Sequence, residues 1–291
     1  MDFAQQLVNG VQIGSVYALV AIGYTMVYGI AKMINFAHGD IIMVGSYVAL
    51  LFFQSSGLPV WGVIAATAAV SAVQGVTIER LAYKPLRGGS RMSALITTIG
   101  VSLMLQNGFL LIFGSSPKPF PNHFTGEGFT LGGVTVSRLT AITLVVTVVL
   151  MVLLTLFVNR TRVGKAMRAV SEDQGAAQLM GINIDTSISI TFAIGSALAA
   201  VAAVLYSSTY PLINPYMGSM LGLRAFIAAA IGGIGVIPGA MIGGFIIGIA
   251  EALIKRYISS AMADAIVFAL LIIVLLVKPS GLLGRNEREK V

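Results

Sequence analysis

The sequence predicts an all-α integral membrane protein. Of its 291 residues, 57% are hydrophobic and only 10% are charged, whereas soluble domains carry about 25% charged residues. The mean hydropathy is +0.92. These charged side chains are too few to cover a water-facing surface, so most of the chain needs the bilayer as its solvent. We therefore expect a single transmembrane domain over residues 1–291, built from about eight or nine helices.

Charge-free runs locate the predicted spans, because a helix needs about 20 apolar residues to cross the hydrocarbon core. The turn-forming sequence QSSGLPVW (54–61) divides the long second run into two spans. YPLINPYMG (210–218) follows a later span, and GGIGVIPG (232–239) leaves a segment at about 222–237 that is short enough to be re-entrant. This division predicts nine apolar segments. The runs are 3–31, 41–78, 92–117, 139–159, 186–223, 225–250 and 265–277, and the last apolar segment covers 261–277.

The positive charges predict the orientation, because Lys and Arg in short loops mark the cytoplasmic side. Of the 18 Lys and Arg residues, 12 lie in three clusters. Placing all three clusters inside puts the N-terminus outside and the C-terminus inside. The clusters are 79–91, 160–168 and 278–290, and the longest polar stretches become an external loop at 114–138 and a cytoplasmic loop at 159–185.

Composition and motifs exclude several function classes. The chain has no Cys and only two His, so disulfides, thiol chemistry and a zinc site are not expected. The net charge is +7, but the basic residues lie in short loops and form no stripe, which argues against nucleic-acid binding. Met1 is followed by no basic region, so we expect no cleaved signal peptide. Gly164-Lys165 has no P-loop pattern around it, so ATP must act on a partner.

Two other classes, ion-coupled secondary transporters and intramembrane enzymes, fit the sequence poorly. An ion-coupled secondary transporter would need carboxylates within the spans and an inverted repeat. Charged residues are scarce in the predicted spans, and no repeat is evident. An intramembrane enzyme would need a recognisable nucleophile and base, and no GxSxG motif or aspartate pair occurs.

A charged segment at 160–185 interrupts the apolar sequence. A capping box of Ser171 and Gln174 is typical of a helix start, and Gly181 is typical of a helix end. We therefore expect a short helix over 172–180, which is marginal alone and needs a surface to pack on.

That surface is either the lipid headgroups or a protein partner. The helix begins with acidic residues, which suits the helix dipole and favours a protein over an anionic leaflet. Its small alanines would allow it to lie deep in a groove. The side chains predicted to dock are Glu172, Asp173, Ala176, Ala177, Leu179 and Met180.

Four motifs, in order along nearly the whole chain, resemble one family. GKAMRAVSEDQGAAQLMGI (164–182) is similar to the cytoplasmic coupling loop of bacterial ABC importer permeases. GYTMVYGIAKMINFAHGDIIMVGSY (23–47), AFIAAAIGGIGVIPGAMIGG (225–244) and KPSGLLG (278–284) resemble the LivH-type permease subunit of branched-chain amino acid importers. The last motif has Lys and Ser where Arg-Pro-Thr-Gly is common in that family.

The resemblance implies a type II ABC importer in the bacterial inner membrane. Two related permease subunits would form the path, as a heterodimer. Two ABC ATPase subunits, which bind ATP and Mg²⁺, would dock on the coupling helices, and a periplasmic binding protein would deliver the substrate. This chain would bind no cofactor. The implied substrates are branched-chain or other small neutral amino acids, and a urea or short-chain amide permease of the same fold is the alternative.

Polar residues lie beside a predicted helix end at NFAHGD (35–40). One interpretation is local: Asp40 caps the following helix and His38 bonds a backbone carbonyl. The other is that Asn35, His38 and Asp40 line and hydrate the translocation path, since irregular backbone at membrane depth is tolerated only where it is buried or wet.

Small residues and isolated charges suggest further contacts. Glycines at four-residue spacing allow helix backbones to approach closely, either within this chain or at the second permease. Glu251 and Lys255 have the spacing of a helical ion pair, and Asp264 fits a helix cap or the headgroup level. The glycines are Gly235, Gly239, Gly243, Gly244 and Gly248. Tyr206, Tyr210 and Tyr216 fit an outer aromatic belt or a docking site for the binding protein.

Overall fold

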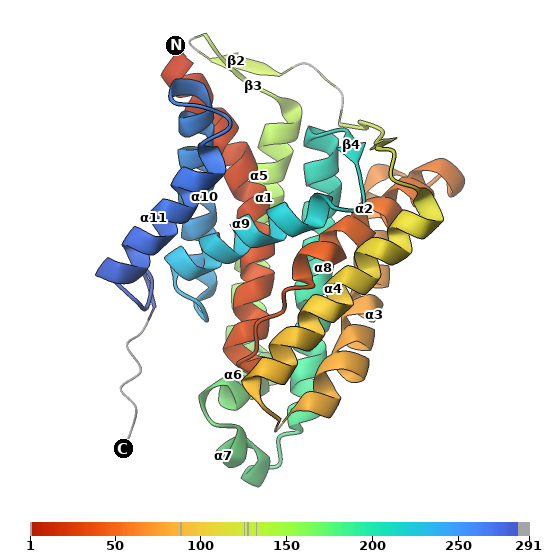
Figure 1. Ribbon diagram of the computed structural model, residues 1–291, viewed down its shortest axis with the longest axis vertical. Helices are drawn as coiled ribbons and strands as arrows, with labels where there is room; N and C mark the ends of the chain where they lie inside the picture. The colour runs from red at the N-terminus through yellow and green to blue at the C-terminus, as the bar shows by residue number, and fades with distance from the viewer. Residues whose placement is uncertain (1, 88, 125, 127, 132, 285–291) are drawn as a thin grey trace.

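The structure, a computed structural model, describes residues 2–87, 89–124, 126, 128–131 and 133–284. These residues form a helical bundle with short strands in the polar loops (Figure 1). The helices are α1 (Asp2–Ala31), α2 (His38–Ser55), α3 (Val60–Ile78), α4 (Arg91–Phe113), α5 (Arg138–Arg160), α6 (Arg162–Glu172), α7 (Gln174–Leu179), α8 (Ile184–Thr209), α9 (Met217–Gly232), α10 (Ile237–Tyr257) and α11 (Ala263–Val277). The strands are β1 (Lys118–Pro119), β2 (Phe129–Leu131), β3 (Val134–Val136) and β4 (Leu212–Ile213).

The predicted all-α membrane fold is confirmed. All nine predicted apolar segments are helical, and the break between α2 and α3 falls within QSSGLPVW as expected. Within the described ranges, six helical segments are long and apolar enough to cross a bilayer. α9 and α11 are shorter apolar helices of 16 and 15 residues.

The predicted bounds of the short segment are wrong. It was expected at about 222–237, but α9 begins at Met217 and ends at Gly232. It ends early because Gly233 has a φ of +109°, a conformation that suits glycine and stops a helix. The next helix then starts with Pro238 in its first turn, where proline is well tolerated.

α1 is the central helix of the bundle. In its most apolar window 83% of the residues are buried, compared with 11% for α4 and 17% for α5. Figure 1 shows α1 in the middle, with α9 crossing in front of it and α10 and α11 to one side. α4 and α5 therefore supply much of the apolar outer surface of the described bundle.

Small residues let α1 and α10 pack with their backbones in contact. A Cβ atom at Gly14 would lie 2.9 Å from Cα of Phe245, and one at Gly244 would lie 2.5 Å from Cα of Ala18. A Cβ atom at Gly248 would overlap the backbone of Gly14. Larger side chains cannot fit, so these glycines set the distance between the two helices.

The loop predicted at 114–138 contains strands that the sequence did not indicate. β1 pairs antiparallel with β4, with Lys118 opposite Ile213, and β2 pairs with β3. The strands gather at the end of the molecule where the N-terminus lies (Figure 1). This loop is thereby tied to the α8–α9 connection.

The basic clusters at 79–91 and 160–168 lie at the same end of the bundle. Lys84 Nζ lies 2.7 Å from Asp185 Oδ2, immediately after α6 and α7. Figure 1 shows α6 and α7 at the end opposite the N-terminus. At the N-terminal end, Arg256 lies 2.8 Å from Asp2. Most of the third cluster, residues 285–290, lies outside the described residues.

We expect Gly248→Ala to lower the free energy of unfolding by about 1–3 kcal/mol, the usual effect of forcing extra volume into a packed contact. The new methyl group would overlap the backbone of Gly14. Thermal unfolding in detergent, followed by circular dichroism, measures the change.

Gly100→Ala in α4 is the matched control, because a Cβ atom there would meet nothing within 4 Å. Alanine favours a helix over glycine by about 1 kcal/mol, so this variant should keep or slightly raise the melting temperature. Equal melting temperatures for the two variants would contradict close α1–α10 packing.

Candidate functional site

A buried polar cluster lies at the start of α2. Asn35, His38 and Asp40 are each only 1% exposed. The helix cap is Ala37, which makes no side-chain cap hydrogen bond, so Asp40 does not cap the helix. Instead Gln106 Nε2 donates to Asp40 Oδ1 at 2.9 Å.

Gln106 was missed in the sequence analysis, although an amide inside the run 92–117 is itself a signal. Its Nε2 atom lies 3.0 Å from Ser219 Oγ in α9 and 3.1 Å from Ser102 Oγ in α4. The amide group therefore joins α4 to both α2 and α9. The cluster is a meeting point of helices that are far apart in sequence.

Several polar atoms of this cluster have no hydrogen-bond partner among the described residues. They are both amide atoms of Asn35, Nε2 of His38 and Oδ2 of Asp40. Leaving a buried polar atom unpaired costs about 1–3 kcal/mol, and such atoms in folded proteins usually bind water. Asn35 lies in the non-helical segment 32–37, and His38 and Asp40 lie in the first turn of α2.

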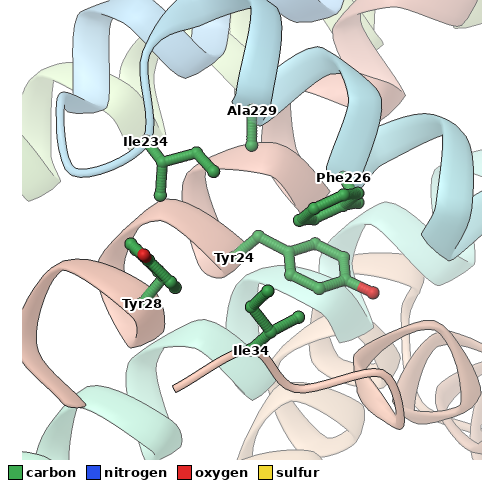
Figure 2. A pocket seen from close by; sticks show the side chains of 6 residues that line it. All are labelled: Tyr24, Tyr28, Ile34, Phe226, Ala229 and Ile234. Atoms are coloured by element: carbon green, nitrogen blue, oxygen red, sulfur yellow. The ribbon is translucent and has the colours of Figure 1, made fainter. Parts of the chain in front are cut away.

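An apolar pocket lies beside the polar cluster (Figure 2). The Tyr24 ring belongs to both, because it lies 4.6 Å from the His38 ring and 6.0 Å from the Phe226 ring. The pocket volume of about 10 Å³ is close to the smallest that holds one water, so in this conformation it has no room for an amino acid. Its lining is Tyr24, Tyr28, Ile34, Phe226, Ala229 and Ile234.

The charged segment begins with α6, which packs along the end of the bundle. Thr161 caps it by accepting a hydrogen bond from the Gly164 amide at 2.9 Å. Gly164, Met167 and Val170 are buried at helical spacing, while Lys165 is exposed. This amphipathic helix fixes the position from which α7 projects.

The predicted capping box is wrong, and the short helix expected over 172–180 begins later and ends earlier, as α7 (Gln174–Leu179). Ser171 lies inside α6, where its hydroxyl donates to the Arg168 carbonyl at 2.7 Å. Asp173 is extended, with a φ of −153°, and its carboxylate accepts from the Ala176 amide at 2.9 Å. Asp173 thus ends one helix and caps the next, because its side chain reaches the free amides of the second helix.

Gly181 ends α7 in the left-handed conformation that the sequence indicates. Its φ is +80°, and its amide bonds the Gln178 carbonyl at 3.0 Å. The Ile182 amide bonds the Ala177 carbonyl at 3.0 Å. These two hydrogen bonds form a Schellman motif, which satisfies the last carbonyls of the helix.

One predicted docking residue faces inward. Ala177 is only 3% exposed and packs against its own protein, because it lies on the side of α7 that turns toward the bundle. Leu179 and Met180 are 90% and 83% exposed. Ala176, Glu172 and Asp173 are also exposed.

A network of charged side chains joins four helices. The sequence did not indicate its central residue, Arg224. Arg224 lies in α9, 3.0 Å from Glu251 and 2.5 Å from Asp264. It also donates to the Tyr17 hydroxyl at 3.0 Å. The predicted pair of Glu251 and Lys255 is confirmed at 2.5 Å. The signal for Arg224 was its position as the lone charge between two apolar runs.

The prediction that Asp264 caps a helix is wrong. The cap of α11 is Met262, without a side-chain hydrogen bond, and the Asp264 carboxylate pairs with Arg224 instead. The ion pair ties α11 to α9.

The predicted packing glycines meet this chain's own helices, with one exception. Cβ atoms at Gly239 and Gly243 would overlap the α9 backbone, and those at Gly244 and Gly248 would collide with α1. Gly235 has a φ of +96° and nothing within 4 Å of a Cβ atom. It is a turn residue between α9 and α10 and not a packing residue.

The three tyrosines lie at the α8–α9 connection. The rings of Tyr206 and Tyr210 are 4.9 Å apart, and Tyr216 is 51% exposed. Tyr210 and Tyr216 stand on the two sides of β4 in the sequence, and Tyr206 lies in the last turn of α8.

Two of the quoted motifs meet in space. The Leu282 amide donates to the Ile231 carbonyl at 2.8 Å, and the Leu283 amide donates to the Gly232 carbonyl at 3.0 Å. KPSGLLG therefore satisfies the last carbonyls of α9, at the start of GGIGVIPG.

The family model described as branched-chain amino acid transport system / permease component matches residues 6–275. High-affinity branched-chain amino acid transport system permease protein LivH of Escherichia coli (strain K12) is 48% identical, covering 99% of this chain and 98% of that protein. Permease protein BraD of Pseudomonas aeruginosa shows the same identity and coverage. A probable LivH of Methanocaldococcus jannaschii is 32% identical, over 91% of this chain and 88% of that protein.

We expect Arg224→Gln to destabilise the fold strongly, because it leaves the nearly buried Glu251 carboxylate with less compensation. Breaking a buried ion pair from one side typically costs about 3–5 kcal/mol. The double variant Arg224→Gln with Glu251→Gln should regain much of that loss, since both charges are removed. Thermal unfolding in detergent measures the order of stability.

Arg256→Gln is the control, because it removes an arginine from an exposed ion pair with Asp2. Exposed pairs contribute little, so its melting temperature should stay near that of the unchanged protein. A double variant no more stable than Arg224→Gln would argue against charge compensation.

Proposed function

This chain belongs to the family of branched-chain amino acid transport system permease components, and we propose that it forms part of the membrane path of an ABC importer for branched-chain and other small neutral amino acids. It is a multi-pass transport subunit and not an enzyme. The names of its relatives support the substrate class, since those at 48% identity are high-affinity branched-chain amino acid permeases. Nothing in the structure favours urea or short amides.

The partners follow from the proposed class. A second related permease subunit completes the path as a heterodimer, two ABC ATPase subunits bind ATP and Mg²⁺, and a periplasmic binding protein delivers the amino acid. The chain itself binds no cofactor in this proposal.

The exposed tip of α7 is the observation that carries the coupling role. Leu179 and Met180 are 90% and 83% exposed on a six-residue helix that lies at the far end of the bundle (Figure 1). A helix this short is marginal alone, and adjacent exposed apolar side chains favour a protein contact. We assign this tip, with Glu172 and Asp173 beside it, to the ATPase.

The polar break before α2 is our candidate for the lining of the path. Unpaired polar atoms of Asn35, His38 and Asp40 would bind water there, and the pocket of Figure 2 offers apolar surface beside them. Because the pocket is too small for an amino acid in this conformation, transport requires α9 or the segment 32–37 to move.

The proposed orientation places α7 in the cytoplasm and the N-terminus and strands outside. The chain has no Cys, so a single cysteine can be introduced at an exposed position. In intact cells an impermeant thiol reagent should label Ser116→Cys and spare Gln178→Cys, and both should react after the cells are opened. The opposite labelling pattern would reverse the orientation.

Reconstitution tests the function. Proteoliposomes that contain the complete importer and its binding protein should accumulate leucine when ATP is supplied inside, and urea should not compete. Leu179→Ser with Met180→Ser should lower both ATPase association and uptake by at least about 10-fold, which corresponds to a loss of about 1.4 kcal/mol.

Gln178→Ser is the matched control on the same helix, because Gln178 is exposed and already polar. It should leave coupling unchanged. Full coupling in the Leu179–Met180 double variant would remove the tip from the ATPase contact, and uptake driven by an ion gradient without ATP would contradict the ABC class.

A further inference from the structure

An open groove lies between α3 and α8, at the same end as α6 and α7. The groove has a volume of about 630 Å³, far more than the roughly 30 Å³ that a water molecule occupies in the liquid. One wall is the ridge of Val76, Arg80 and Lys84, at four-residue spacing, and the other comes from the first turns of α8. It is large enough for a ligand headgroup.

The charges around the groove are largely paired with one another. Lys84 lies 2.7 Å and Arg87 2.5 Å from the Asp185 carboxylate, and Arg87 also pairs with the buried Glu79. Two cations thus compensate two carboxylates. Arg80 is exposed and makes no ion pair in the part of the chain that the structure describes. The groove therefore carries one uncompensated positive charge.

Further hydrogen-bond donors lie on the opposite wall. Asn183 uses its Oδ1 atom to accept from the Thr186 amide at 3.0 Å. The Asn183 Nδ2 group and the Thr186 hydroxyl make no hydrogen bond within the part of the chain that the structure describes. Ser189 is already occupied, because its hydroxyl donates to Glu79 Oε2 at 2.6 Å. One guanidinium and two neutral donors thus face the same space.

The groove becomes apolar toward the middle of the bundle. Val76, Ile190 and Ala193 line it one to two turns farther along the helices. The outer face of α3 and of the helical turn that follows it is also apolar, since Val73 and Leu81 are 67% and 75% exposed. In a membrane protein such a face lies against acyl chains, and the basic end lies at headgroup level.

We propose that this groove binds an anionic phospholipid. The phosphate accepts hydrogen bonds from Arg80, Asn183 and Thr186, and the acyl chains follow Val76 and Ile190. The lining of the groove favours a lipid over a protein partner. A single uncompensated cation lies at one end, and a continuous apolar wall runs from there toward the middle of the bundle, as a headgroup and its acyl chains require. Basic pockets between transmembrane helices suit anionic headgroups for this reason.

Purified protein in nanodiscs provides the test. The nanodiscs contain phosphatidylcholine with a small fraction of phosphatidylglycerol, and the lipid that the protein retains is counted by native mass spectrometry. We expect Arg80→Gln to lower retained phosphatidylglycerol about 5-fold, the change given by ~1 kcal/mol per basic residue near the surface. Arg160→Gln, which removes an exposed cation outside the groove, should retain it.

A second variant separates lipid binding from bulk charge. Ile190→Trp keeps every charge and fills the apolar part of the groove, so it should also reduce retention while thermal unfolding shows a folded protein. Equal retention in Arg80→Gln and the unchanged protein would overturn the proposal. Release of the lipid by inorganic phosphate would overturn it as well. So would a photo-crosslinker at position 186 that, in the complete importer, captures another subunit instead of lipid.

Discussion

The contact between α1 and α10 is the constraint on which the other helices depend. Between apolar helices in a bilayer there is no hydrophobic driving force, so stability comes from close packing. Gly14, Gly244 and Gly248 allow the two backbones to touch. α1 can then contact α8 on another side and support α9 across its front (Figure 1). A wider separation between α1 and α10 would displace α9 and the polar groups it carries.

Polar groups inside this bundle fall into two kinds, those that are paired with one another and those that are not. The Arg224 network is charge-compensated, because Arg224 pairs with Glu251 and Asp264 and Lys255 pairs with Glu251. It ties α9, α10 and α11 together. The cluster at Asn35 and His38 is more deeply buried, yet it leaves atoms without partners among the described residues. The first arrangement suits elements that keep their relative positions, and the second suits a place where water or a passing ligand supplies the missing hydrogen bonds.

The apolar spans and their breaks could be predicted because charge-free runs and Pro-Gly sequences are local signals. The failures were of another kind. Ser171 and Asp173 both lie where a cap is plausible, and only the packing of α6 on the bundle decides in favour of Asp173. Ala177 was assigned to a partner because a sequence does not show which side of a short helix faces its own protein. Arg224 was overlooked because its partners come from three other helices.

The hydrogen bonds between Leu282, Leu283 and the end of α9 determine which positions of this segment can be substituted. Both bonds use main-chain amides, which any residue except proline supplies. Gly281 has a φ of +76° and no space for a side chain. Lys278 donates to the Leu282 carbonyl at 2.6 Å, which an arginine could also do. A Cβ atom at Gly284 would also overlap the Ser280 carbonyl. Natural variation can therefore replace Ser280, and Lys278 by arginine, while two glycines and two amide protons must be inherited unchanged.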